Sequence, residues 1–243
     1  MRRWTAMGLA ALLSACVPAT IPLPDLGPPV PALVARPVPP AEAAAAARAF
    51  DEVVARVEPV AEALCRARTR NVECDMRFLI DPRPALPPNA YQTLDDRGRA
   101  VIGLTQSLVR DARNADELAF VMGHEAAHHI AGHIPRQADT ALRGALVAGV
   151  LATLAGADEA TVREIQRAGA ELGARTYSRA FELEADALGT EIAWRAGYDP
   201  LRGAAFFARL PDPGDRALPT HPPNALRVTV VRDTLERLGA DLP

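Results

Sequence analysis

Lysine is absent from this chain of 243 residues, so all 27 basic residues are arginine, which we attribute to genomic composition. With 30 acidic residues the formal net charge is −3. The sequence shows no basic patch with interleaved aromatic residues, which argues against nucleic acid as a partner. Its glycine-rich stretches lack the spacing of a phosphate-binding loop, and no ordered set of serine, histidine and aspartate suggests a serine hydrolase.

The sequence also has no long apolar run, so no stretch of it could span a bilayer as a helix. The best candidate, residues 144–157, is too short and is bounded by Arg143 and Asp158. We interpret it as a buried or cleft-covering helix whose alanine, glycine and valine content would allow close packing.

Cysteine is scarce, and the first of three cysteines lies in an export signal. Two arginines at positions 2 and 3 precede a mostly apolar stretch, residues 4–13, which leads into Leu13-Ser14-Ala15-Cys16. This pattern matches a bacterial lipoprotein signal and predicts a lipid on Cys16. Val17 favours delivery to an outer membrane. The alternatives are a plain secretory signal and an uncleaved anchor.

The other two cysteines, Cys65 and Cys74, are expected to pair. Exported proteins fold in an oxidising compartment, where two cysteines this close in sequence form a disulfide. The bond would tie the end of an N-terminal helix to the first strand. Thiolates suit structural metal sites rather than hydrolytic ones, so we do not expect these cysteines to bind a catalytic metal.

Four of the five histidines lie within ten residues, and three residues of this run form the motif H-E-x-x-H: His124, Glu125 and His128. Residues four apart share one face of a helix, so both imidazoles can bind one metal ion. The glutamate is the general base of zinc-dependent peptidases with this motif. The motif predicts one Zn²⁺ per chain and an enzyme. The alternative is that these histidines decorate a solvated helix end.

The residues around the motif predict a helix over 115–133. Asn114 followed by Glu117 is a variant of the capping box that begins helices, and apolar residues follow at helical spacing. The next proline, Pro135, predicts that the helix stops after His133.

A catalytic zinc usually has three protein ligands, so one more is needed. His129 and His133 each follow a motif histidine by five residues and point away from the ligand face, so we expect them to be structural or solvent-exposed. Glu182 shares a helix face with Asp186, whereas Glu184 points nearly opposite. We expect Glu182 to bind zinc and Asp186 to accept the outer N–H of a ligating histidine. The alternative is that these acids merely solvate a helix.

In these motifs the chain resembles the gluzincin zinc metallopeptidases that include HtpX and the CAAX prenyl endopeptidase, and it is closest to their soluble periplasmic members. Five pieces run in one order from about Asp75 to the C-terminus. Besides the two motifs above, they are Asn89-Ala90, Gly197-Tyr198-Asp199-Pro200, and Thr220-His221-Pro222-Pro223 with Arg227 following. The resemblance implies that Glu182, rather than Glu184, is the third ligand.

The expected fold is α+β and mostly helical: a zincin-type metallopeptidase domain with a small β-sheet packed beside the H-E-x-x-H helix. Residues 1–15 form the signal, 16–40 the acylated cysteine and a linker with nine prolines between Pro18 and Pro40, and 41–243 the peptidase domain. Strands are predicted near 76–81, 90–94 and 100–104, and further helices at 41–68, 178–196, 200–210 and 222–239. The edge at 89–93, including Asn89 and Ala90, is the candidate for binding substrate as an added strand.

The oxyanion that develops during amide hydrolysis needs a positive or hydrogen-bonding partner. His221, Arg227 and Tyr198 are candidates, each from a family-like motif. His221 has two other interpretations: it could occupy the open position of the zinc as a plug, or it could be a turn residue before a proline pair.

The predicted function is a zinc endopeptidase of the periplasm, lipid-anchored to the outer membrane, which removes misfolded or misassembled envelope proteins. Its partners would be unfolded or extended protein substrates, the membrane, and envelope assembly machinery. One alternative is a processing protease of narrow specificity. Another is a non-proteolytic, chaperone-like binding module with a structural metal, against which the intact Glu125 argues.

Overall fold

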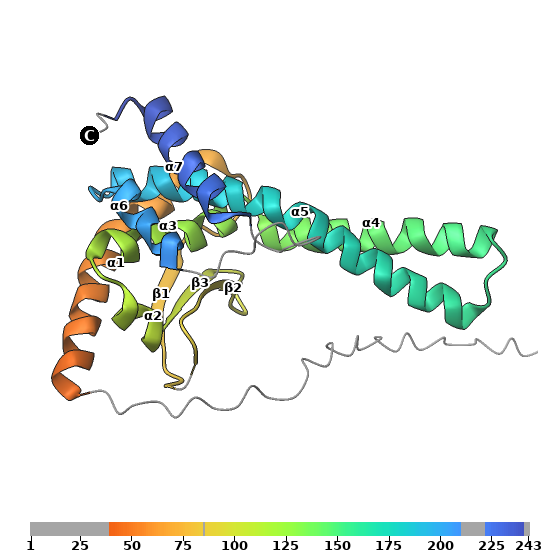
Figure 1. The fold of residues 1–243 in the computed structure, drawn as a ribbon, viewed down its shortest axis with the longest axis horizontal. Helices are drawn as coiled ribbons and strands as arrows, with labels where there is room; N and C mark the ends of the chain where they lie inside the picture. Colours follow the sequence, from red (N-terminus) through yellow and green to blue (C-terminus); the bar gives the residue numbers. More distant parts are fainter. Residues whose placement is uncertain (1–38, 85, 210–221, 241–243) are drawn as a thin grey trace, which may run out of the picture. The chain divides into compact units, whose positions relative to one another are not determined.

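A small β-sheet lies beside a group of longer helices in the computed structural model, which describes residues 39–84, 86–209 and 222–240 (Figure 1). The strands are β1 (Met76–Asp81), β2 (Ala90–Leu94) and β3 (Ala100–Thr105), in the order β1-β3-β2. β3 pairs in parallel with β1 and antiparallel with β2. β2 therefore lies at an edge of the sheet, as the sequence predicted.

Helices make up most of the described chain. They are α1 (Pro40–Arg68), α2 (Gln106–Asp111), α3 (Ala115–Ile130), α4 (His133–Leu154), α5 (Glu159–Arg195), α6 (Pro200–Ala204) and α7 (Asn224–Leu238), with a 3-10 turn at Ala205–Arg209. This arrangement confirms the predicted fold class. The short helix α2 was not predicted, and the helix that carries Glu182 begins 19 residues earlier than the predicted residue 178.

The helix α3 runs through the centre of the hydrophobic core, and nearly all its residues are buried. Phe120 and Met122 are fully buried, together with Ile102 from β3, Val57 from α1 and Ile192 from α5. α3 therefore contacts α1, α5 and the sheet at once, which holds any residue on it rigidly.

The start of α3 is capped as its sequence predicted. The side chain of Asn114 accepts a hydrogen bond from the backbone N–H of Glu117 at 3.0 Å. The side chain of Glu117 in turn accepts the backbone N–H of Arg113 at 2.8 Å and two guanidinium bonds from Arg209, each 2.6 Å long. The bond from the Glu117 N–H satisfies one of the groups that a helix start otherwise leaves without a partner, and the other bonds tie Glu117 to Arg113 and Arg209.

The predicted end of α3 was wrong. α3 stops at Ile130, and Gly132 adopts a left-handed conformation with φ 66°, which glycine tolerates without steric cost. α4 then begins at His133, with Pro135 inside its first turn, where proline is accommodated. Pro135 therefore belongs to the start of the next helix, and His133 does not continue the face of α3.

The interpretation of residues 144–157 as a buried or cleft-covering helix was also wrong. These residues lie mostly in α4, which pairs with the first half of α5 as an antiparallel hairpin (Figure 1). Several of its large apolar side chains are exposed, among them Leu146 and Leu154. Within the described ranges no helix is both long and apolar enough to cross a membrane.

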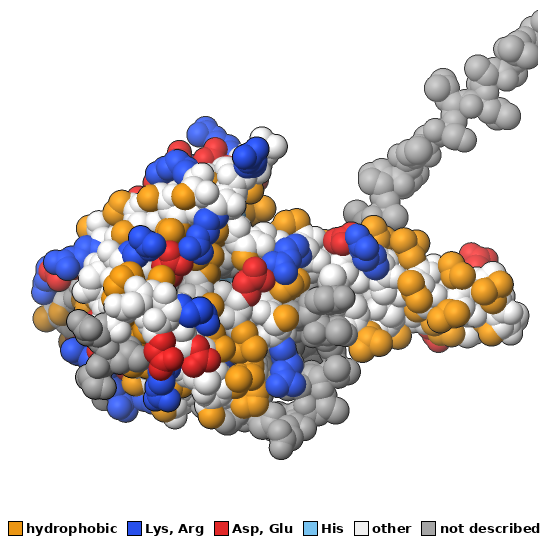
Figure 2. Space-filling view, turned by 90° about the horizontal axis from the view of Figure 1, so that it is seen from above, with side chains coloured by type: hydrophobic (Ala, Val, Ile, Leu, Met, Phe, Trp, Pro, Cys, Tyr) orange, Lys and Arg blue, Asp and Glu red, His pale blue; other side chains and the backbone are white. Residues whose placement is uncertain are grey.

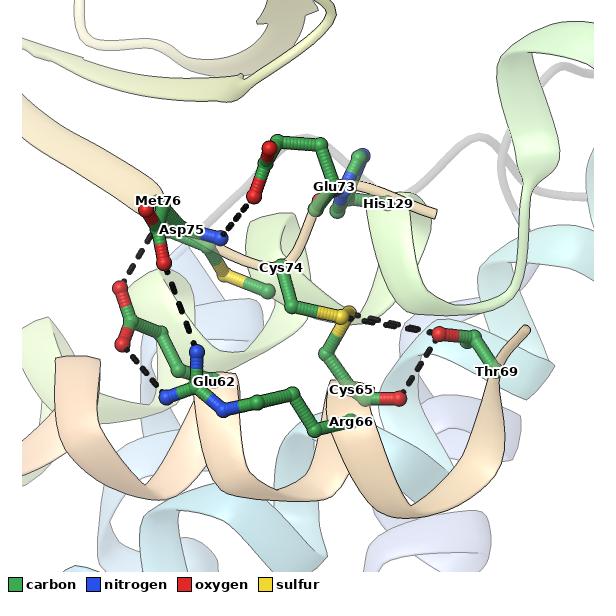
Figure 3. The surroundings of a disulfide bond; sticks show 9 residues. All are labelled: Glu62, Cys65, Arg66, Thr69, Glu73, Cys74, Asp75, Met76 and His129. Carbon is green, nitrogen blue, oxygen red and sulfur yellow. Dashed lines mark hydrogen bonds and ion pairs between the residues drawn. A yellow bond between two sulfur atoms is a disulfide. The ribbon is translucent and has the colours of Figure 1, made fainter. Parts of the chain in front are cut away.

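Cys65 and Cys74 form a disulfide with 5.6 Å between their Cα atoms, and it joins the end of α1 to the segment before β1 (Figure 3). His129 lies beside it and donates its Nε2–H to the backbone carbonyl of Glu73 at 2.6 Å. His129 is buried and structural, and it ties α3 to the segment that the disulfide fixes.

Candidate metal centre

His124, His128 and Glu182 bring three ligand atoms to one point. The Nε2 atoms of the two histidines are 3.1 Å apart, and they lie 3.6 and 3.5 Å from the nearest carboxylate oxygens of Glu182. Ligands bound tetrahedrally to zinc at about 2.0–2.1 Å lie about 3.3 Å from one another. The nitrogen and oxygen donors therefore fit a zinc ion in both chemistry and spacing.

These ligands meet because α3 and α5 cross at two glycines. A Cβ atom on Gly189 would lie 2.7 Å from the backbone nitrogen of His124, and one on Gly123 would lie 2.9 Å from the carbonyl oxygen of Gly189. Such distances leave no room for a side chain. The glycines let α5 come close enough for Glu182, two turns before Gly189, to reach the histidines of α3. The sequence analysis did not identify this requirement.

Asp186 orients His124 and is itself held by an arginine. Its Oδ1 lies 2.9 Å from Nδ1 of His124, so that Nε2 faces the ligand point. Arg227 donates from Nε and Nη2 to the two oxygens of Asp186, at 2.8 and 2.7 Å, and stacks 3.7 Å from the ring centre of Phe207. The guanidinium of Arg227, a predicted oxyanion partner, is thus engaged in supporting the His124–Asp186 pair.

His133 supports the second ligand, a role that the sequence analysis missed. Its Nδ1 lies 2.8 Å from Nδ1 of His128, and its Nε2 lies 3.2 Å from Glu184. If His128 binds metal through Nε2, its Nδ1 donates a proton to His133, whose Nε2–H then donates to Glu184. Arg136 holds Glu184 at 2.8 Å, and the ring of Phe181 stacks on His133 with 4.5 Å between centroids.

The two ligand histidines have opposite pKa shifts. Burial lowers the pKa of His124, but hydrogen bonds to Asp186 and Glu182 outweigh burial and raise it to about 10. Burial and the positive charge of His124 lower the pKa of His128 to about 3. Burial also lowers the pKa of His133, so that its ring is neutral and can accept a hydrogen bond from His128. Metal binding at His124 must therefore displace a proton.

Glu125 and Glu182 stand between two cavities. One has a volume of about 330 Å³ and is lined mainly by apolar side chains, with the edge strand contributing Asn89 and Ala90. The other, of about 210 Å³, is lined by Gln92 of the same strand and by His128. The edge strand β2 therefore runs past the ligands from one cavity to the other.

Tyr198 is not brought to this centre. Tyr198 packs over the core at the far end of α5, with Arg56 5.9 Å from its ring centre, and it lines neither cavity. His221 and Cys16 lie outside the described residues.

A comparison with protein families decides the class of this site. The profile of "Peptidase family M48" matches residues 49–235, which include every ligand and supporting residue described above. The chain belongs to peptidase family M48. Peptidases of family M48 are metalloproteases, and the ligand set of His124, His128 and Glu182 lies within the matched region.

Two curated relatives share part of the M48 region. The chain is 34% identical over 145 residues to a putative beta-barrel assembly-enhancing protease of Vibrio cholerae serotype O1, covering 54% of this chain and 30% of that protein. It is 30% identical over 117 residues to the beta-barrel assembly-enhancing protease of Yersinia pestis, covering 45% and 24%. The matched regions span less than a third of each relative.

Proposed function

We propose that the chain is a zinc metalloendopeptidase that hydrolyses peptide bonds of unfolded or misassembled cell-envelope proteins. The observation that carries this proposal is the spacing of His124, His128 and Glu182, with Glu125 bordering both cavities beside them. A structural zinc site uses a fourth protein ligand, whereas three ligands next to an open cavity are typical of a catalytic site.

The chain's own residues then have distinct tasks in hydrolysis. Zinc, when bound, supplies the Lewis acid that polarises the scissile carbonyl and makes water more acidic. Glu125 accepts a proton from the attacking water and delivers it to the leaving amine. Asp186 and His133 each hold the outer nitrogen of one ligand histidine, which keeps both rings oriented.

Substrate binding would use the edge of β2. An extended polypeptide that pairs with this edge recognises the strand through backbone hydrogen bonds, which imposes little sequence preference. Because Asn89 and Ala90 border one cavity and Gln92 the other, such a chain would cross the ligand point. The larger cavity, lined by Phe120, Phe206 and other apolar residues, would accept a large apolar side chain next to the cleaved bond.

The cellular setting is part of the same proposal. A lipid on Cys16 and the proline-rich linker would tether the domain to the outer membrane, facing the periplasm, and the names of both relatives associate them with β-barrel assembly. Envelope assembly machinery is then a candidate partner. A processing protease of narrow specificity, or a chaperone-like module with a structural metal, is the competing function.

The direct test is cleavage of unfolded casein by zinc-loaded protein. We expect Glu125→Gln to abolish turnover while retaining zinc, and the matched change Glu164→Gln, at an exposed position of α5 remote from the ligands, to leave turnover unchanged. Equal cleavage by Glu125→Gln and wild type would remove this residue from the mechanism. Absence of cleavage by wild-type, zinc-loaded protein would favour the chaperone-like alternative.

Two further measurements test the setting. Envelope proteins that accumulate are compared between cells with wild-type enzyme and cells with Glu125→Gln. Many unfolded substrates would support quality control, and one defined cut site would support a processing protease. Mass spectrometry of the mature protein should find an acylated Cys16 at its N-terminus. An unmodified terminus, or one at another position, would contradict the anchor.

A further inference from the structure

The outer face of α4 exposes an unusual amount of apolar surface. Six large side chains on it are between 55% and 79% exposed: Leu142, Leu146, Val147, Val150, Leu151 and Leu154. Figure 2 shows hydrophobic side chains gathered along this hairpin. Together they expose on the order of 600 Å² of apolar surface, the upper end of what the largest patch on a monomeric protein usually reaches.

In this hairpin the small residues lie between the two helices and the large apolar residues lie outside, the reverse of a helix pair in water. Its seam is made of small residues: a Cβ on Gly144 would lie 2.1 Å from the carbonyl oxygen of Gly169, and one on Gly173 would lie 2.3 Å from that of Thr140. In water, large apolar residues normally fill such a seam. Small residues inside and large apolar residues outside are the pattern of helices surrounded by lipid.

The one polar side chain between Arg143 and Asp158 also suits an apolar environment. It belongs to Thr153, whose hydroxyl donates to the backbone carbonyl of Gly149, four residues earlier, at 2.9 Å. This bond satisfies the hydroxyl without water, as burial in hydrocarbon requires. Residues 144–157 therefore present no polar group that needs water on this face.

The other side of the hairpin is charged. The exposed positions of α5 include Arg163, Glu164, Arg167 and Glu171, together with the apolar Ile165 and Leu172. The α4 side of the hairpin is thus mainly apolar and the α5 side carries four exposed charges, which is the distribution of a helix lying in a membrane surface. The apolar face runs from Leu142 to Leu154 in α4. At 1.5 Å per residue these 13 residues extend about 20 Å, too short to cross a hydrocarbon core of about 30 Å.

The arc of this face distinguishes lipid from a second copy of the chain. Successive helix residues are about 100° apart, so the six side chains cover roughly half the circumference of α4. A single helix from a second copy would cover only a stripe of roughly 100° of this face. The area buried on α4 would then be well under the roughly 800 Å² per partner of a stable interface. Acyl chains are fluid and can cover the whole face.

We infer that the outer face of α4 inserts into one leaflet of a lipid bilayer, with the hairpin lying along the membrane surface and the charged side of α5 facing water. This insertion would be a second membrane contact, separate from any lipid on Cys16. It does not depend on peptidase activity.

The first test measures co-sedimentation with vesicles of phosphatidylethanolamine and phosphatidylglycerol at 3:1. The protein is the complete zinc-loaded chain with Cys16→Ser, so that no acyl chain contributes. We expect it to bind, and Leu146→Ser with Leu151→Ser to lower the vesicle partition coefficient at least tenfold. The control Leu94→Ser, at an exposed leucine of β2, should change it less than twofold.

Three outcomes would overturn the inference. They are no vesicle binding by the Cys16→Ser chain, equal binding by the double leucine variant, or a dimer in sedimentation velocity that the leucine changes dissociate. The last result would assign the face to a second copy. The zinc content of each variant shows whether the part of the chain that holds the metal ligands remains folded. It also separates a failure of the membrane inference from a failure of the proposed peptidase site.

A second test reports the orientation of the hairpin. Val150→Trp places an indole on the apolar face and Arg167→Trp places one on the charged side. With vesicles containing brominated lipid, we expect strong quenching of the added fluorescence at position 150 and little at 167. Equal quenching at both positions would contradict insertion of the α4 face.

Discussion

Replacing Gly189 by alanine should weaken zinc binding without touching any ligand. The added Cβ would lie 2.7 Å from the backbone nitrogen of His124, whereas ordinary contacts begin near 3.4 Å, so α3 and α5 must separate by about 0.7 Å. Metal–ligand distances tolerate errors of about 0.2 Å. Glu182 would then be displaced from the two histidines, and we expect zinc affinity to fall at least about tenfold, as for loss of a supporting residue.

Stability alone is a poor readout of this substitution. Overpacking costs about 1–3 kcal/mol, while alanine in place of glycine within a helix gains about 1 kcal/mol. The net loss in the free energy of unfolding of the metal-free protein is then about 0–2 kcal/mol, which does not report on the position of Glu182. The assay is therefore a competition titration with a chromophoric zinc chelator, supported by thermal melts.

The matched control is Gly169→Ala, on the same helix but 13 residues before Glu182. Its Cβ would clash with Ala148 in the hairpin seam at 2.5 Å. We expect zinc affinity within about twofold of wild type, since the clash is remote from the ligands. Wild-type zinc affinity in Gly189→Ala would show that the close crossing of α3 and α5 does not position Glu182.

Other predictions concern the ligands and their partners. Glu182→Ala should remove most bound zinc, measured by elemental analysis, and Glu184→Ala should retain it; the reverse ranking would overturn the choice of third ligand. His133→Phe should lower zinc affinity by about 10–100-fold because His128 loses its acceptor, whereas His133→Asn, which keeps an acceptor, should recover part of it; equal affinities would assign His133 a packing role only. Because the pKa of His124 is raised to about 10, its ring is protonated at pH 7.5 in the metal-free protein. Calorimetry at pH 7.5 in buffers of different ionisation enthalpy should detect release of about one proton per zinc, and zinc affinity should fall as pH is lowered. Zinc binding without proton release would contradict the raised pKa.

Much of this site could be predicted from the sequence because its residues are local to helices. The four-residue spacing of His124 and His128, and that of Glu182 and Asp186, fixes each pair on one helix face. The structure brings both pairs together, with Asp186 at the outer nitrogen of His124. The capping residues of α3 and the two cysteines of the disulfide were likewise readable from short-range patterns.

What escaped prediction depends on backbone turns and on contacts between distant elements. The position of His133 depends on the left-handed Gly132, which redirects the chain before the histidine. From helical spacing alone, His133 pointed away from the metal. The engagement of Arg227 with Asp186, 41 residues away, required knowledge of how α5 and α7 pack.

The hairpin shows another limit of pattern reading. A run of apolar residues bounded by charges normally predicts burial, because exposed apolar surface is unfavourable in water. In α4 the small residues in the seam are buried or half-buried and the large ones are exposed, so composition alone gave the wrong environment for residues 144–157. The spacing of Gly144, Ala148 and Gly169 contains the signal, but only once the pairing of the two helices is known.

The most direct test of the central claim is X-ray absorption spectroscopy at the zinc edge on stoichiometrically loaded protein. The account predicts two imidazoles and one carboxylate at about 2.0–2.1 Å, with no sulfur, and loss of the carboxylate contribution in Glu182→Ala. A sulfur shell near 2.3 Å, or a spectrum unchanged by Glu182→Ala, would place the metal elsewhere and contradict the assignment of this centre.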